Sequence, residues 1–270
     1  MFKYIAGNNR QKLLKQTTKI LKHNKFPIVN YILENNKYNK YKVFNEYIKL
    51  LDVIDSDYKI ALKLSSLDFD IDMTGRLIEN YKLKNINIII DAEDNANNEK
   101  YNIITNDLMY DYNKTDFSVI KTYQLYRKDS FKELADNISF MKKHNLCFGS
   151  KLVRGAYYNS EKHEGHLFEN KKDTDKNYNN GIVECLKYNN SYNIIASHNK
   201  ESIKLACELN KNNKIFSFAH LMGMNENYME HIKKDNKVYT YVPYGPYKEM
   251  IPYLSRRLYE NIDAIKYMVV

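Results

Sequence analysis

Short apolar and β-branched runs alternate with stretches of helical periodicity along the whole chain, and this alternation limits the possible folds more than any other feature. The runs are too apolar for strands with one exposed face, so the pattern predicts a parallel sheet covered by helices. A chain of 270 residues suits one closed (βα)8 barrel. An open doubly wound sheet is the alternative. It loses support because the chain has neither a GxGxxG nor a GxxxxGK[ST] loop.

Eight runs are predicted to be strands: residues 26–33, 60–66, 86–92, 118–126, 146–155, 192–198, 214–221 and 238–243. The predicted helices include residues 13–21, 43–54, 131–141, 201–209 and 248–262. We interpret the polar stretch 94–100 as a loop leading into the next helix, not as a domain boundary. A single domain over residues 1–270 is therefore expected.

Charge and cysteine content exclude several classes of function. The 42 Lys and Arg against 33 Asp and Glu give a net charge of +9, which would suit an anionic ligand, a membrane face or nucleic acid. The lysines are scattered, however, which indicates a composition bias, so we expect no nucleic-acid binding. Cys147, Cys185 and Cys207 form no CxxC pair, which predicts reduced thiols and no zinc site. His163 and His166 lie in a polar stretch without a third ligand at suitable spacing, so no metal is expected.

No apolar run approaches the roughly 18 residues that a transmembrane helix needs. The first residues resemble neither a secretion signal nor a transit peptide, which predicts an intracellular protein in a reducing compartment.

In a (βα)8 barrel, ligands bind at the carboxyl ends of the strands. A polar residue at one strand end is usually an ordinary loop residue, but here such residues recur on successive strands. The polar residues near the predicted strand ends are Glu34, Lys63, Ser65, Asp91, Glu93, Gln124, Lys151, Arg154, Ser197, His198, Asn199, His220 and Tyr241.

Arginine is rare in this lysine-rich chain, yet two arginines stand side by side near the carboxyl terminus. Tyr253, Arg256, Arg257 and Glu260 have helical spacing and share one stripe of the last predicted helix. Guanidinium groups bind carboxylates through two parallel hydrogen bonds, which lysine cannot do. The stripe therefore predicts a clamp for a small carboxylate, with an ordinary solvated face as the alternative.

Several motifs resemble the proline dehydrogenase family. The two most specific are KLVRGAYY at residues 151–158 and YVPYG followed by YLSRRLYEN. Shorter ones occur in the family's order: YIAG at Tyr4, ALKLS around Lys63, IDAED from Ile90, FENKKDTDKNY from Phe168, SHN at Ser197 and HLMGM from His220. The amino-acid sequences of the longer motifs are closer to the eukaryotic branch of the family than to the bacterial one.

The resemblance implies a distorted barrel with its last helix over the mouth, and FAD-dependent oxidation of L-proline to Δ1-pyrroline-5-carboxylate with electrons passed to a quinone. It implies that Asp91 and Lys151 are catalytic. The residues implied to hold the substrate are Lys63, Tyr241, Tyr253, Arg256, Arg257 and their acidic partner Glu34. The residues implied to bind the flavin are Ala92, Gln124, Val153, Arg154, Gly155, Tyr157, Thr174, Ser197, His198, Asn199 and Glu260.

One position departs from the bacterial pattern, because members of that branch often carry Arg where this chain has Lys151. Lysine supplies the charge without the planar fork, so we expect activity with an altered flavin potential. Gly155, which lacks a side chain, is expected to let the backbone approach the cofactor.

Two other functions stay open. Hydroxyproline dehydrogenase shares the fold and the clamp, although a bulky phenol at Tyr241 favours proline. A barrel that has lost turnover and acts as a flavin-binding interaction protein is the alternative outside the enzymes. The resemblance also implies peripheral membrane association, and a mitochondrial location for a eukaryotic member or a cytoplasmic one otherwise.

Overall fold

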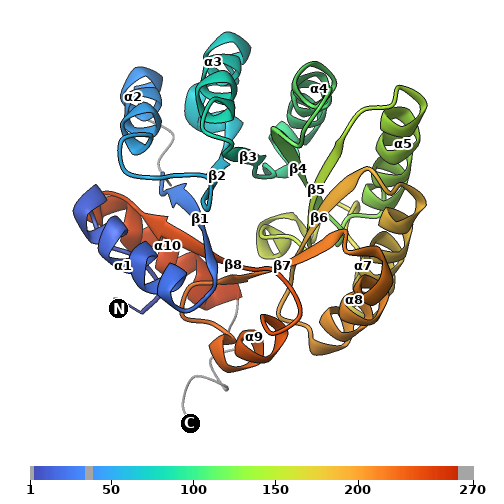
Figure 1. The fold of residues 1–270 in the computed structure, drawn as a ribbon. Helices are drawn as coiled ribbons and strands as arrows, with labels where there is room; N and C mark the ends of the chain where they lie inside the picture. Colours follow the sequence, from blue (N-terminus) through green and yellow to red (C-terminus); the bar gives the residue numbers. More distant parts are fainter. Residues whose placement is uncertain (1–2, 34–38, 261–270) are drawn as a thin grey trace.

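A closed barrel of eight parallel strands forms the centre of the fold in the computed structural model, which describes residues 3–33 and 39–260 but not the side chains of residues 256–260. The strands follow each other in chain order around the barrel, and the last pairs with the first (Figure 1). The strands are β1 (Phe26–Tyr31), β2 (Lys59–Leu62), β3 (Asn87–Ile90), β4 (Val119–Gln124), β5 (Phe148–Val153), β6 (Ser191–Ala196), β7 (Phe216–Leu221) and β8 (Val238–Tyr244).

Helices surround the barrel (Figure 1). They are α1 (Arg10–Lys22), α2 (Lys40–Leu50), α3 (Ile71–Lys82), α4 (Asn95–Tyr112), α5 (Ser130–Lys143), α6 (Tyr158–Glu161), α7 (Lys171–Glu184), α8 (Lys200–Asn213), α9 (Glu226–Ile232) and α10 (Tyr247–Glu260), with the short 3-10 helices η1 (Leu64–Leu67) and η2 (Cys185–Lys187). The predicted (βα)8 barrel is confirmed, and each of the eight predicted runs overlaps one strand.

Some predicted boundaries are wrong. The prediction of a loop over residues 94–100 fails because α4 begins at Asn95, where the Asp94 side chain accepts a hydrogen bond from the Asn97 amide at 3.2 Å. Aspartate is a favoured N-cap, so this polar stretch is the first turn of the helix. The helix predicted over residues 43–54 ends at Leu50. Residues 261 and 262 of the last predicted helix lie outside the described residues.

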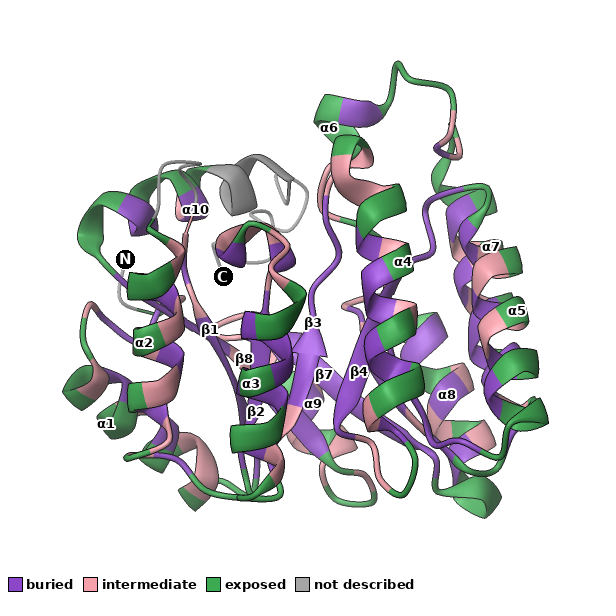
Figure 2. Cartoon of the chain, turned by 90° about the horizontal axis from the view of Figure 1, so that it is seen from above, coloured by how far each residue is buried: buried purple, intermediate pink, exposed green. Residues whose placement is uncertain are grey.

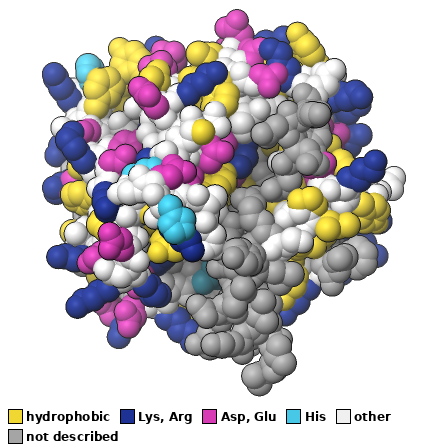
Figure 3. All heavy atoms as spheres, turned by 180° about the vertical axis from the view of Figure 1, so that it is seen from behind, with side chains coloured by type: hydrophobic (Ala, Val, Ile, Leu, Met, Phe, Trp, Pro, Cys, Tyr) yellow, Lys and Arg dark blue, Asp and Glu magenta, His cyan; other side chains and the backbone are white. Residues whose placement is uncertain are grey.

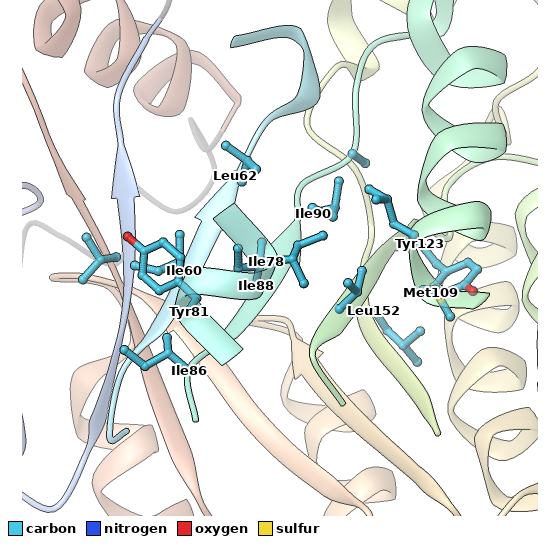
Figure 4. Close-up of a cluster of buried hydrophobic side chains, with 14 of the residues drawn as sticks. Ile60, Leu62, Ile78, Tyr81, Ile86, Ile88, Ile90, Met109, Tyr123 and Leu152 are labelled. Atoms are coloured by element: carbon cyan, nitrogen blue, oxygen red, sulfur yellow. The ribbon is translucent and has the colours of Figure 1, made fainter. Parts of the chain in front are cut away.

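Apolar side chains fill two layers, one inside the barrel and one between the barrel and its helices. Successive residues of a strand point to opposite faces. Ile60, Ile88 and Ile90 therefore point outward and pack near Ile78 and Tyr81 of α3 (Figure 4). The inner layer consists of Ile28, Ala61, Ile89, Ile120, Ile194, Ala219 and Tyr239. Side chains thus fill the barrel, as is usual for this fold.

The last helix lies at the end of the barrel where the strands finish. Figure 2 shows α10 at the same end as α6, which follows β5. Met250 and Tyr253 of α10 pack with Ile5 and with Ile32, the residue that directly follows β1. In a regular barrel the last helix packs against the outer face of the last and first strands. Here α1 packs against β1 and β8 instead (Figure 1). This agrees with the predicted position of the last helix over the mouth.

The surface bears mixed charges. Basic and acidic side chains are interspersed on the face in Figure 3. None of the helices in residues 3–33 and 39–260 is long and apolar enough to cross a membrane. Within the same residues, His, Cys, Asp and Glu side chains form no group of three that could hold a metal. Cys147, Cys185 and Cys207 are all free thiols.

Candidate active site

A ring of polar residues lies above the inner apolar layer of the barrel. Four polar residues each lie two or four positions after an inward-facing residue of the same run, so they point inward as well. They are Asp91, Gln124, Lys151 and Tyr241. Asp91, Gln124 and Lys151 are buried. Residues from four different strands therefore meet at the carboxyl end of the barrel, where (βα)8 enzymes bind their substrates.

Asp91 is the centre of this group. Its Oδ1 accepts a hydrogen bond from the Lys151 ammonium, and its Oδ2 accepts one from the Tyr241 hydroxyl at 2.6 Å. The Lys151 Nζ also lies 5.5 Å from the centre of the Tyr241 ring. Because the side chains of Lys151 and Asp91 are only 7% and 12% exposed, water screens this ion pair weakly. The three groups hold one another in a fixed arrangement.

Lys63 links a second group of residues at the same end. Its Nζ donates to the Tyr157 hydroxyl at 2.5 Å and lies 3.9 Å from Glu93 Oε2. Glu93 is buried and also accepts hydrogen bonds from the Ser65 amide and hydroxyl, at 2.9 and 3.0 Å. Burial raises the pKa of Glu93, although Lys63 and Ser65 act in the opposite direction. Lys63 is thus a cation with a buried acidic neighbour.

Arg154 points toward the helices. Its guanidinium donates to Asp175 on α7 at 2.7 and 2.9 Å, to the Ser197 hydroxyl at 2.5 Å and to the Ser202 hydroxyl at 3.1 Å. It also lies 4.4 Å from the centre of the Tyr178 ring. Although burial alone would raise it, the pKa of Asp175 is lowered by hydrogen bonds from Lys171 and Arg154. Arg154 therefore joins the rim of the barrel to α7 and α8.

The predicted residues after β6 lie next to Arg154. The Asn199 amide donates to the Ser197 hydroxyl oxygen at 3.0 Å, and the Asn199 side chain caps α8. His198 between them is half-buried. Ser197 thus accepts hydrogen bonds from two neighbours, Arg154 and Asn199.

Gly155 has a structural requirement that the sequence did not reveal. Its φ is +153°, and an added Cβ would lie 1.4 Å from Cε1 of Tyr126. The Tyr126 ring thus fills the space where a side chain would be. This gives a reason for glycine that does not depend on a cofactor.

The other predicted site residues are distributed as follows. Ala92 and Thr174 are buried, and the Thr174 hydroxyl donates to the Asn170 carbonyl at 3.3 Å. Val153 ends β5 on its inner face. Tyr253 is buried with Ile5, Ile32 and Met250. The predictions for Glu34 and for the side chains of Arg256, Arg257 and Glu260 lie outside the described residues.

The His220 side chain points away from the barrel interior. It follows the inward Ala219 and faces outward, where its Nε2 is 3.0 Å from the Thr240 hydroxyl and its Nδ1 is 2.8 Å from the Met224 carbonyl. Burial lowers the pKa of His220. Its position at a strand end therefore did not bring it into the barrel interior.

Two acids near the site, the half-buried Asp175 and the buried Glu161, took no part in the predicted site. Asp175 lies within the FENKKDTDKNY motif, so the sequence could have identified it as a site residue. No sequence pattern pointed to Glu161, which is buried on α6, because a four-residue helix is too short for hydrophobic periodicity to reveal its buried face.

Comparison with solved structures places the fold among (βα)8 barrels. The chain superposes with a TM-score of 0.87 on proline utilization A (PutA) from Bdellovibrio bacteriovorus inactivated by N-propargylglycine, at 20% identity, over 96% of this chain and 32% of that one. The protein is thus a (βα)8 barrel with a cluster of hydrogen-bonded and ion-paired polar side chains at its mouth.

The chain belongs to the proline dehydrogenase family, whose profile it matches over residues 11–268. It is 30% identical to the mitochondrial proline dehydrogenase 1 of Drosophila melanogaster over 209 residues, which are 67% of this chain and 30% of that protein. It is also 30% identical to the hydroxyproline dehydrogenase of Xenopus laevis over 215 residues, 71% of this chain and 45% of that protein. The chain thus spans less than half the length of these relatives. The predicted family is confirmed, and its relatives are mostly eukaryotic mitochondrial enzymes.

The family is FAD-dependent, and the residues at the mouth have chemistry that fits a flavin. Gln124 on β4, Lys151 and Arg154 at β5 and Ser197 after β6 bring amide, ammonium, guanidinium and hydroxyl donors to three neighbouring strands. Flavin carbonyls and a diphosphate both require such donors.

Proposed function

We propose that this protein oxidises L-proline to Δ1-pyrroline-5-carboxylate with FAD as its cofactor and a quinone as the electron acceptor. The observation that carries the proposal is the convergence of Asp91, Lys151 and Tyr241 at the mouth of a barrel that belongs to the proline dehydrogenase family. The substrate is a small zwitterion, so its site needs cations for the carboxylate and a wall for the ring.

The substrate carboxylate would bind to Lys63 together with Arg256 and Arg257. Lys63 is suited to this role because Glu93 and Tyr157 hold its ammonium in place. Tyr241 would form a wall of the pocket, since its hydroxyl is bound to Asp91 and its ring cannot turn away without breaking that bond. A substrate fixed at these points loses little further freedom on the way to the transition state.

The reaction removes a hydride from C5 and a proton from the nitrogen, and bound FAD would supply the two-electron acceptor. Lys151 would place a fixed positive charge at the base of the pocket, held there by Asp91. Such preorganised charge stabilises negative charge that develops during a reaction. Gln124, Arg154 and Ser197 would hold the cofactor through hydrogen bonds.

The test is an anaerobic absorbance scan of the purified, FAD-reconstituted protein before and after addition of L-proline. We expect the protein to bind FAD and the flavin bands to bleach with proline. A protein that takes up no FAD would contradict the proposal. A protein that binds FAD without bleaching would instead support the inactive flavin-binding barrel.

Hydroxyproline dehydrogenase is the second candidate, supported by the similarity to the Xenopus laevis enzyme. The phenol of Tyr241 leaves little room for a ring hydroxyl, so we favour proline. Turnover of L-proline and trans-4-hydroxyproline under the same conditions separates the two functions.

The similarity to mitochondrial enzymes supports a mitochondrial location. Peripheral membrane association is part of the proposal because the proposed quinone acceptor lies in a membrane. Co-sedimentation with vesicles that contain ubiquinone, followed by quinone reduction upon addition of proline, would test both the partner and the acceptor.

A further inference from the structure

The loop between β5 and α6 carries three of the proposed ligand-binding residues: Arg154, Gly155 and Tyr157. Figure 2 shows α6, which ends this loop, at the end of the barrel where the strands finish. Arg154 and Tyr157 reach different partners, Asp175 and Lys63 respectively. The path of the chain between these two residues therefore determines whether both contacts form together.

Glu161 at the end of α6 ties this loop to the barrel. Its side chain is 4% exposed. Its Oε1 accepts a hydrogen bond from the Asn95 amide at 2.8 Å, and its Oε2 accepts one from the Tyr126 hydroxyl at 3.1 Å. The Arg127 guanidinium lies 3.8 Å from Oε2 and is itself buried. One carboxylate thus joins α6 to the start of α4 and to the segment after β4.

Tyr126 transmits this restraint to the loop. Its ring occupies the space beside Gly155, and its amide donates to the Arg154 carbonyl at 2.8 Å. Burial, and secondly Glu161, raise the pKa of Tyr126, so its hydroxyl remains a hydrogen-bond donor. The position of the Tyr126 ring therefore depends on Glu161, and the turn at Gly155 depends on the ring.

A buried carboxylate is costly unless it is fully bonded, and a neutral residue would give the same packing at lower cost. The negative charge of Glu161 therefore indicates a specific role, because the carboxylate provides two strong hydrogen-bond acceptors and an ion-pair partner for Arg127. We propose that Glu161 is a positioning residue, which fixes the β5–α6 loop so that Arg154 and Tyr157 meet the flavin and the substrate. This inference rests on the proposed function.

The main variant is Glu161→Gln. Glutamine keeps the size and can still accept from the Asn95 amide, but its second terminal atom is a donor and it carries no charge for Arg127. A second variant, Tyr126→Phe, keeps the ring against Gly155 and removes only the hydroxyl. Glu184→Gln is the matched control, because Glu184 at the end of α7 is also a buried glutamate and pairs with Lys187 of η2 at 2.9 Å.

Three readouts are measured on each variant: the dissociation constant of FAD, the split between KM and kcat for proline, and amide hydrogen exchange over residues 154–161. For Glu161→Gln we expect FAD binding weakened about tenfold, a raised KM and exchange at least about tenfold faster, since hydrogen bonds to a charged group are lost. Tyr126→Phe should change all three in the same direction but less. Glu184→Gln should leave all three unchanged.

Wild-type values of FAD affinity and KM in Glu161→Gln would overturn the positioning role, even if the variant melts at a lower temperature. If Glu161→Gln does not fold, wild-type values in Tyr126→Phe would overturn it. A wild-type protein that takes up no FAD overturns the proposed function instead, and the exchange rates then still decide whether Glu161 fixes the loop.

Discussion

The Tyr241 hydroxyl donates a 2.6 Å hydrogen bond to Oδ2 of Asp91, although the two residues lie 150 positions apart in the sequence. Lys151 binds the other oxygen of the same carboxylate. Asp91 is thus held from β5 and from β8, and it in turn fixes the phenol of Tyr241. Closure of the barrel makes this contact possible, because it brings residues near the ends of β3, β5 and β8 to one mouth.

Tyr241→Phe removes this hydrogen bond and keeps the ring. A hydrogen bond to a charged group contributes about 1.5–3 kcal/mol, so we expect the KM for proline to rise roughly tenfold to a hundredfold while FAD stays bound. The ring would also become free to move, so turnover of trans-4-hydroxyproline should rise relative to proline. Steady-state kinetics with both substrates measure the two effects. An unchanged ratio and KM would show that the phenol does not form the pocket wall.

Lys151→Met should destabilise the fold. The substitution leaves the buried Asp91 carboxylate without its cation, which costs about 3–5 kcal/mol when a buried pair is broken from one side. The double variant Asp91→Asn/Lys151→Met should recover part of that loss. Urea unfolding measures the free energies. Lys132→Met is the control, because Lys132 pairs with Asp136 where both side chains are exposed (82% and 62%), and equal losses in the two single variants would contradict the role of burial.

The barrel could be predicted because its strands are buried on both faces. The Ile-rich run of β3, for example, has one face in the inner layer and one against α3, so its sequence is uniformly apolar. α4 was harder to predict because its first turns, Asn95 onward, are almost entirely polar. There, the N-cap Asp94 was the stronger signal, and the prediction of a loop overlooked it.

The candidate site could be predicted only in part. Strand ends pointed to Asp91, Lys151 and Tyr241, which meet because closure is a property of the whole sheet. The direction of a side chain depends on its phase along the strand, and a one-residue difference separates the inward Ala219 from the outward His220. Glu161 acts on the site through the β5–α6 loop, and hydrophobic periodicity does not predict the path of a loop.

Arg256→Lys and Arg257→Lys test the proposed carboxylate clamp. Lysine keeps the charge and loses the two parallel hydrogen bonds, so we expect a loss of about 2–5 kcal/mol, or roughly 30-fold or more in the KM for proline. Bound FAD should be unaffected. Arg76→Lys is the control, because Arg76 stacks over Phe44 on the outer helices. A wild-type KM in both clamp variants would remove the clamp from the proposed function.

Lys59 lies at the opposite end of the barrel, where the strands begin. The Lys59 Nζ lies 4.8 Å from the centre of the Tyr192 ring and 5.4 Å from that of Tyr239, and it donates to the Asn87 side chain. Lys237 lies over the same Tyr239 ring, at 5.5 Å. Burial, and secondly the charge of Lys237, lower the pKa of Lys59 from 10.5 to about 7.

This shift predicts how stability depends on pH. Between about pH 7 and 10.5 the unfolded chain holds a proton on Lys59 that the folded protein lacks, so stability rises with pH, by up to ~1.4 kcal/mol per pH unit. Below about pH 7 both states are protonated and the folded protein bears the whole cost of the buried charge. Lys59→Met removes that cost, so we expect the variant to be more stable than the wild type at pH 7 and this advantage to shrink toward pH 10. Urea unfolding at several pH values, with the exposed Lys132→Met as control, measures the difference; a difference between variant and wild type that stays constant with pH would mean that Lys59 keeps its proton throughout.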